Sequence, residues 1–257
     1  MGKKLIVANW KMHFTVGQAS LFLHRLQERV PSHRDVETVL CPNFLALQSL
    51  SLQLDRHKFK LGAQNCYEKD EGAFTGEVSA TMLRGLVNYV IIGHSERRYI
   101  LEETDKRIAQ KVAAVQRNDL TPILCVGETE IERKHGETRH VLHDQITTGI
   151  ANLTAAEIKK MVIAYEPVWA IGTGNYAKPD DVAEAVSLIR SQIKALYGAP
   201  ASLMVRVLYG GSVTADNAGA YLVTEGVDGL LVGGASLNYD TFARIVTKAH
   251  QTSEQEM

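Results

Sequence analysis

Eight short, almost continuously apolar runs, separated by amphipathic segments, constrain the fold of this chain more than any other feature. Strands that are apolar on both faces are typical of parallel sheets covered by helices, whereas half-solvated antiparallel strands alternate in polarity. The expected strands begin near Leu5, Val36, Phe59, Asn88, Pro122, Met161, Met204 and Val227. Eight strand and helix units over about 250 residues match a (β/α)₈ barrel, an α/β fold with eight parallel strands.

The segments between the strands have the periodicity of amphipathic helices. After the sixth strand, apolar residues recur at alternating intervals of four and three, which places them on one helical face. These residues are Val182, Val186, Ile189, Ile193 and Leu196. Pro179 suits the first turn of this helix, and a similar apolar face follows Thr104. No low-complexity linker divides the chain, so we expect one domain over residues 1–257, with a frayed polar tail at 251–257.

The charge balance and the length of the apolar runs limit the classes of binding partner and the cellular location that we expect for this chain. Lys and Arg number 28 against 29 Asp and Glu, so no basic excess indicates nucleic acid or an anionic membrane. The apolar run at residues 5–8 is too short for a signal sequence or a membrane span, and no later run is long enough. Cys41, Cys66 and Cys125 are odd in number and widely spaced, which favours reduced thiols. We therefore expect a cytoplasmic protein that acts on a small molecule.

The segment EPVWAIGTG, which follows the sixth strand, combines a carboxylate with a stiff turn and glycines. Pro167 fixes its own φ and biases Glu166 toward an extended backbone, so the carboxylate is held at a strand end and can act as a base. The apolar residues before Gly172 and Gly174 suit a lid that excludes water and pivots at flexible positions. The alternative is a buried strand end followed by an ordinary loop.

Two other strands also end in polar side chains. Asn9 and Lys11, two residues apart after the first strand, project to the same side. His94 follows the fourth strand, with Ser95 as the expected cap of a helix and Glu96 in its first turn. The positive end of that helix favours a neutral imidazole. Singly, these are explained as a turn residue, a surface lysine and a core histidine, but three strands bring reactive groups to one end of the barrel.

The seventh and eighth strands are followed by the glycine-rich turns YGGSV and VGGAS. Backbone N–H groups of such turns, together with a helix N-terminus, form an anion cradle, and phosphate is the usual occupant of this corner of a barrel. Ser212 adds a hydroxyl and Gly172 of the lid adds another N–H. The glycines concerned are Gly210, Gly211, Gly233 and Gly234. The alternative is that they serve tight turns only.

Six motifs in order, ANWKM, IIGHSERR, CVGET, AYEPVWAIGTG, YGGSV and GLLVGGAS, resemble those of the triosephosphate isomerase family, and the resemblance covers residues 3–250. It implies a TIM barrel that interconverts dihydroxyacetone phosphate and D-glyceraldehyde 3-phosphate through an enediol(ate). It also implies a role in glycolysis and gluconeogenesis, with no cofactor and no metal.

The resemblance implies a role for each matching residue. Glu166 is then the base and His94 the neutral electrophile, while Asn9 and Lys11 hold the developing enediolate oxygens. Glu96 orders the site around Lys11 and Ser95. The phosphate is bound by Gly172, Ser212, Gly233 and Gly234.

The chain departs from the commonest family pattern in two places. His13-Phe14 stands where Asn-Gly is usual, and the far end of the lid, GNYAKP, lacks the usual lysine or aspartate and small hydroxyl residue. The assigned roles are unaffected, because the departures concern the lid and the expected subunit contact near Met12 and His13. In the family the third loop, here Cys66 to Ser79 with Thr75 at its tip, reaches into a neighbour's site. The resemblance therefore implies a homodimer rather than a long solvated loop.

Three alternatives belong to other functional classes. A non-catalytic phosphometabolite-binding barrel would keep the phosphate loops alone, and the polar residues at three other strand ends argue against it. Gly172, Gly174 and Ala177 fit the G-x-G-x-x-A pattern of nucleotide-dependent oxidoreductases, but residues 167–171 separate them from the strand and residues 192–197 contain no acid.

A zinc site is the third alternative. His135, His140 and His143 lie on a polar helix, yet the sequence suggests no acidic or thiol ligand to complete such a site.

Overall fold

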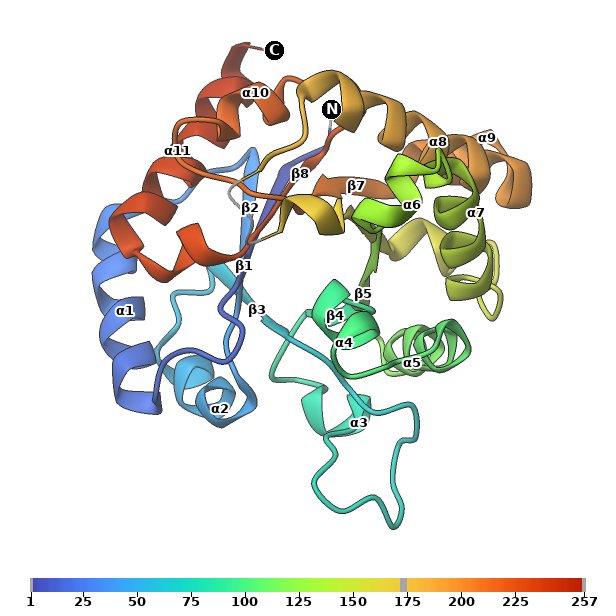
Figure 1. Ribbon diagram of the computed structural model, residues 1–257. Helices are drawn as coiled ribbons and strands as arrows, with labels where there is room; N and C mark the ends of the chain where they lie inside the picture. The colour runs from blue at the N-terminus through green and yellow to red at the C-terminus, as the bar shows by residue number, and fades with distance from the viewer. Residues whose placement is uncertain (1, 172–174, 256–257) are drawn as a thin grey trace.

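The computed structural model describes residues 2–171 and 175–255, which form the predicted barrel (Figure 1). Within these residues, eight parallel strands pair in chain order, and β8 pairs with β1 to close the ring. They are β1 (Lys4–Asn9), β2 (Val36–Cys41), β3 (Phe59–Ala63), β4 (Tyr89–Ile92), β5 (Thr121–Val126), β6 (Val162–Tyr165), β7 (Arg206–Tyr209) and β8 (Gly229–Val232). Each strand begins within two residues of its predicted start, so the (β/α)₈ prediction is confirmed.

Helices form the layer outside the strands (Figure 1). The α-helices are α1 (Val16–Arg29), α2 (Phe44–Gln53), α3 (Ala80–Leu83), α4 (Ser95–Tyr99), α5 (Asp105–Arg117), α6 (Glu130–Lys134), α7 (Thr138–Gly149), α8 (Pro179–Tyr197), α9 (Ala199–Met204), α10 (Ala218–Leu222) and α11 (Tyr239–Gln255). Short 3₁₀ helices are η1 (Ile158–Lys160), η2 (Val168–Ala170) and η3 (Gly234–Leu237). α8 begins at Pro179 and buries its predicted face except Leu196, which is exposed in the last turn. The apolar face predicted after Thr104 is buried in α5, and Thr104 is the N-cap of this helix.

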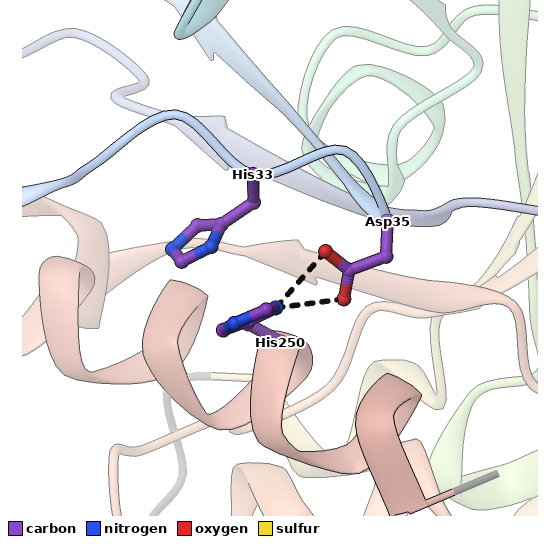
Figure 2. Close-up of side chains that lie close together, drawn as sticks. All are labelled: His33, Asp35 and His250. Atoms are coloured by element: carbon purple, nitrogen blue, oxygen red, sulfur yellow. Dashed lines mark hydrogen bonds and ion pairs between the residues drawn. The ribbon is translucent and has the colours of Figure 1, made fainter. Parts of the chain in front are cut away.

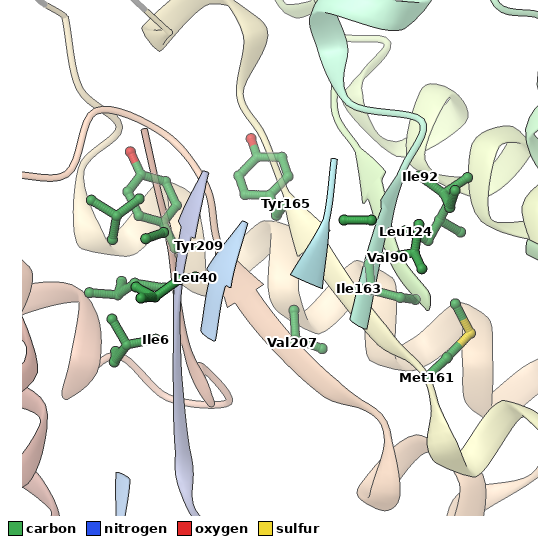
Figure 3. Close-up of a cluster of buried hydrophobic side chains, with 14 of the residues drawn as sticks. Ile6, Leu40, Val90, Ile92, Leu124, Met161, Ile163, Tyr165, Val207 and Tyr209 are labelled. Atoms are coloured by element: carbon green, nitrogen blue, oxygen red, sulfur yellow. The ribbon is translucent and has the colours of Figure 1, made fainter. Parts of the chain in front are cut away.

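Successive residues of each strand belong to two different apolar clusters. Leu5 and Val7 of β1 join a cluster made of strand residues alone, whereas Ile6 and Ala8 join a larger cluster that also contains residues of the helices. The first cluster therefore fills the barrel, and the second lies between barrel and helices, where Figure 3 draws part of it. Because both faces are buried, the strands are mostly apolar, and the charged Lys60 and Arg206 within them both pair with Glu37. The three cysteines are buried free thiols, as predicted.

The seam between β8 and β1 depends on a glycine. Gly229 has φ of 158°, and a Cβ there would lie 1.9 Å from the carbonyl oxygen of Leu5. The backbone N–H of Leu5 donates to the carbonyl of Asp228 at 2.9 Å. Any side chain at residue 229 would therefore separate the first and last strands.

α11 packs against β1, one side of this seam, and against β2. It is helical as far as Gln255, so most of the segment expected to be frayed is part of this helix, and Thr252 is buried. None of the described helices is long and apolar enough to cross a membrane. One domain over residues 1–257 stays a prediction.

Candidate active site

The residues predicted at the strand ends meet at one cavity of about 520 Å³ at the C-terminal end of the barrel. Side chains after β1, β4 and β6 line one part of it, and the glycine turns after β7 and β8 line another. The predicted residues that line it are Asn9, Lys11, His94, Glu166, Gly210, Gly211, Ser212, Gly233 and Gly234. Ser95 and Glu96 contact these residues from α4. Gly172 lies outside the described residues.

Glu166 is almost fully buried, with 2% exposure, and is aimed at the start of α4. Its Oε2 accepts a hydrogen bond of 3.0 Å from the backbone N–H of Ser95. Its Oε1 lies 3.1 Å from His94 Nε2, although it accepts no well-formed hydrogen bond. The adjacent Pro167 has φ of −63°, which is the restriction expected of it. A carboxylate and an imidazole therefore share the floor of the cavity.

Two glycines on the neighbouring strand ends make room for this carboxylate. A Cβ at Gly127 would lie 1.8 Å from the backbone oxygen of Glu166, and one at Gly210 would lie 3.0 Å from its Cγ. Gly210 was predicted to bind phosphate or form a turn, whereas Gly127 was given no role. The CVGET motif was the available signal for Gly127, but sequence alone does not show which backbone it approaches.

His94, rather than the predicted Ser95, is the N-cap of α4. Its Nδ1 accepts a hydrogen bond of 3.2 Å from the backbone N–H of Glu96, while Ser95 is the first helical residue. The correction has a physical reason: the imidazole can reach the free N–H groups of the first turn and replaces the hydroxyl as their acceptor. An accepting Nδ1 assigns the proton of the neutral ring to Nε2, the nitrogen beside Glu166.

Lys11 is held by contacts at both its backbone and its side chain. Its φ of 52° is unusual for a residue with a side chain. The backbone N–H of Lys11 donates to Asn9 Oδ1 at 3.1 Å, and Gln64 Nε2 donates to its carbonyl at 2.8 Å. At the other end, Lys11 Nζ lies 2.6 Å from Glu96 Oε1. Gln64 was not singled out from the sequence, because nothing local distinguishes it from an ordinary residue after a strand.

The glycine turns leave an open corner of the cavity beside Lys11. A Cβ at Gly233 would make ordinary contact with Lys11 Cε at 3.5 Å, and one at Gly234 would meet nothing within 4 Å. The turn is closed by Ser236, whose hydroxyl donates to the carbonyl of Gly233 at 2.7 Å. On the opposite side, the hydroxyl of Ser212 donates to the carbonyl of Ala170 at 2.6 Å. This corner can accept an anion, since it offers backbone donors and one ammonium group.

A buried carboxylate that the sequence analysis did not single out holds the near end of the lid. Glu128 has no exposed surface, and its Oε1 accepts hydrogen bonds from Trp169 Nε1 at 2.9 Å and from the hydroxyl of Tyr165 at 3.1 Å. The guanidinium of Arg133 lies 4.3 Å from the centre of the Trp169 ring. Burial raises the pKa of Glu128, while these donors oppose the rise. Glu128, which belongs to the CVGET motif, thus anchors η2.

The far end of the lid, which departs from the family pattern, is also attached to the barrel. Ala177 is buried, and its carbonyl accepts a hydrogen bond of 2.8 Å from the hydroxyl of Tyr221. The backbone N–H of Lys178 donates to Asp181 at 3.1 Å, and Asp181 pairs with Arg133 at 3.1 Å. Arg133 therefore contacts Trp169 at the near end of the lid directly, and is linked to Lys178 at the far end through Asp181.

Comparisons with known proteins agree with this geometry. A family model described as "Triosephosphate isomerase" matches residues 4–249. The chain is 45% identical to a triosephosphate isomerase of Alkaliphilus metalliredigens over 96% of this chain and 99% of that protein. It is 43% identical to one of Clostridium tetani over 95% and 96%, and 44% identical to one of Dictyoglomus turgidum over 96% and 99%, respectively.

The substitution Glu128→Gln removes the ionisable group but keeps an acceptor for Trp169 and Tyr165. Burial raises the pKa of Glu128 in the folded state above its ordinary value of 4.5. The contribution of this group to stability is therefore fully present below pH 4.5 and is lost as the pH rises through the folded-state pKa. We expect the free energy of unfolding of the variant to improve relative to the wild type as pH rises from about 4.5 to about 7.5, measured by urea titration. Glu130→Gln, at an exposed site, is the control. A difference that does not change with pH would contradict the prediction.

Proposed function

Because the chain belongs to the triosephosphate isomerase family and is therefore an isomerase of that kind, we propose that it interconverts dihydroxyacetone phosphate and D-glyceraldehyde 3-phosphate with Glu166 as the base and His94 as the electrophile. The observation that carries the proposal is the convergence of Glu166, His94 and Lys11 with the glycine turns after β7 and β8 in one cavity. A barrel that only binds phosphometabolites would not need the first two groups.

The chemistry accounts for the residue types. A proton next to a carbonyl is weakly acidic, so its removal needs a base in contact and donors for the charge that develops on oxygen. Glu166 would take the proton from one carbon and return it to the neighbouring carbon. His94 Nε2–H and the Lys11 ammonium would donate to the two oxygens of the enediolate. Glu96 supports this role by holding Lys11 Nζ at 2.6 Å.

Proton transfer also requires that Glu166 leave its present hydrogen bond. Its Oε2 is now an acceptor for Ser95 N–H at 3.0 Å, so contact with substrate requires the carboxylate to turn into the cavity. The side chain of Ser212 ties the phosphate corner to Ala170 at the base of the lid. Binding of phosphate by Ser212, Gly233 and Gly234 would therefore change the contact between Ser212 and Ala170 of η2.

The lid would protect the intermediate. An enediolate that carries a phosphate can lose it by elimination, and a closed apolar lid limits this reaction and excludes water. Gly172 lies outside the described residues. Its proposed role, as a backbone hydrogen-bond donor to the phosphate, rests on its sequence motif alone.

The loop 66–79 supports the proposal of a homodimer. It extends away from the barrel between β3 and α3 (Figure 1) and is preformed, because Tyr67 N–H donates to the carbonyl of Val78 at 2.8 Å and Tyr67 stacks on Phe74. Residues 71–77 of this loop are exposed, and Met12, which follows β1, is 95% exposed. We include a cytoplasmic location in the same proposal.

The substitution Glu166→Gln tests the base. Gln cannot take a proton but retains an oxygen that can accept from Ser95 N–H, so we expect a folded protein whose kcat falls by about 10²–10⁴-fold. Its affinity for glycerol 3-phosphate, an analogue that cannot isomerise, should stay near that of the wild type. A coupled assay and calorimetry measure the two quantities. Near-normal turnover would exclude Glu166 as the base, and a wild type that binds the analogue without turnover would support the non-catalytic barrel.

The pair Gly233→Asp and Gly233→Ala tests the phosphate corner. A Cβ at this position makes only an ordinary 3.5 Å contact with Lys11 Cε, so Ala should be tolerated. Asp places a carboxylate beside Lys11 and should raise KM by about 10- to 100-fold through repulsion of phosphate. Steady-state kinetics of both variants separate charge from bulk. Equal KM values for the Gly233→Asp variant and the wild type would show that this turn does not bind the substrate.

Sedimentation measures the proposed dimer directly. We expect twice the chain mass of 28.3 kDa for the wild type, and the single-chain mass for Thr75→Arg, because a charged side chain at the loop tip would be buried in the partner. Leu203→Arg, on α9, is the control for a new arginine at an exposed position. Wild-type protein of single-chain mass would show that the loop does not pair two copies.

A further inference from the structure

A second cluster of chemically reactive side chains lies at the end of the barrel opposite the active site. His33 and Asp35 belong to the segment just before β2, and His250 lies near the end of α11. Figure 2 shows the three side chains pointing toward one another from these two segments. Because parallel strands all begin at the same end, a group before β2 is remote from groups that follow the strands.

The geometry of the cluster is close. One donor atom of each residue lies within 4.8 Å of the donor atoms of the other two. His250 Nδ1 is 2.9 Å from each carboxylate oxygen of Asp35. The rings of His33 and His250 lie with their centres 4.0 Å apart and 32° between their planes. All three residues are partly exposed.

One ring nitrogen of His33 is unsatisfied. Nε2 of His33 is buried and has no hydrogen-bond partner among the described residues. A buried polar nitrogen without a partner costs about 1–3 kcal/mol, and such atoms are few in folded proteins. The ion pair between His250 and Asp35 accounts for the positions of these two side chains, but it provides no partner for Nε2 of His33.

We propose that His33, Asp35 and His250 bind one divalent transition-metal ion of the zinc class. Two imidazole nitrogens and one carboxylate oxygen suit Zn²⁺, whereas Ca²⁺ and Mg²⁺ prefer oxygen ligands throughout. A tetrahedral ion with bonds of about 2.1 Å separates its ligands by about 3.4 Å. The present separations, from 2.9 Å to no more than 4.8 Å, include that value, so only small movements are needed. Water would complete the coordination.

Glu254 supports this arrangement by contacting His250, one of the proposed ligands, rather than the ion itself. Its Oε1 lies 3.4 Å from His250 Nε2, the ring nitrogen that does not face Asp35. Metal-binding histidines commonly direct their second nitrogen to a carboxylate, which fixes the ring and the tautomer. On binding, the proton between His250 Nδ1 and Asp35 would leave to solvent, and the ion would take its place between the two ligands.

The consequence would be a clamp on the closed barrel. The ion would join the segment before β2 to α11, the helix that packs over β1 and β2. It would stabilise the folded chain because it binds the folded state and not the unfolded one. The site shares no residue with the catalytic cavity, so isomerase activity should not depend on it.

The test is a calorimetric titration of chelator-treated protein with ZnCl₂, with thermal unfolding measured before and after addition. We expect one equivalent to bind and the midpoint of unfolding to rise. His33→Phe keeps a ring against His250 but removes a ligand, and should weaken Zn²⁺ binding by more than about tenfold, since even loss of an outer partner costs 10- to 100-fold.

His140→Asn is the matched control. His140 and His143 on α7 each lie near Asp144, at 3.3 Å and 2.9 Å, and are exposed, but no convergent group of three forms there among the described residues. This variant should bind Zn²⁺ like the wild type. The proposal is wrong if the wild type shows no saturable binding, if His33→Phe binds equally well, or if His140→Asn alone loses the ion.

Discussion

Closure of a parallel barrel requires every strand to be buried on two faces, and this constraint determines where polar groups can lie in the chain. The inner face of β1 packs within the barrel and its outer face packs under helices, so a strand such as Leu5–Ala8 has no exposed side. Polar side chains are therefore concentrated where strands end. Since all strands run in one direction, their C-terminal ends deliver Asn9, His94 and Glu166 to one place without any long-range pairing signal.

Burial then makes each of these groups depend on its neighbours. An unpaired charge in such a site would be costly, and each carboxylate has a donor: Glu166 has Ser95 N–H, Glu96 has Lys11, and Glu128 has Trp169. The same contacts link separate strands. The network explains how buried polar groups are tolerated at the C-terminal end of the barrel.

The barrel, the strand starts and most of the cavity-lining residues were predictable, because they follow from local patterns of polarity and from motifs. What the sequence did not reveal depends on distance in the chain. Gly127 is needed because it touches the backbone of Glu166, and Gln64 because it reaches the carbonyl of Lys11. His94 replaced Ser95 as the cap through a side-chain orientation that periodicity does not specify. The contact between Asp35 and His250 joins residues 215 positions apart, and no local pattern predicts it.

The pairing of β1 with β8 also has a consequence for synthesis of the chain. β1 leaves the ribosome before the other strands of the barrel, yet one of its edges finds its partner only when Gly229–Val232 has emerged. Until then the nascent chain presents an open sheet edge and an apolar inner surface, both of which promote association with other chains. Translation speed and chaperone access should therefore affect the yield of this protein more strongly than they affect proteins built from local hairpins.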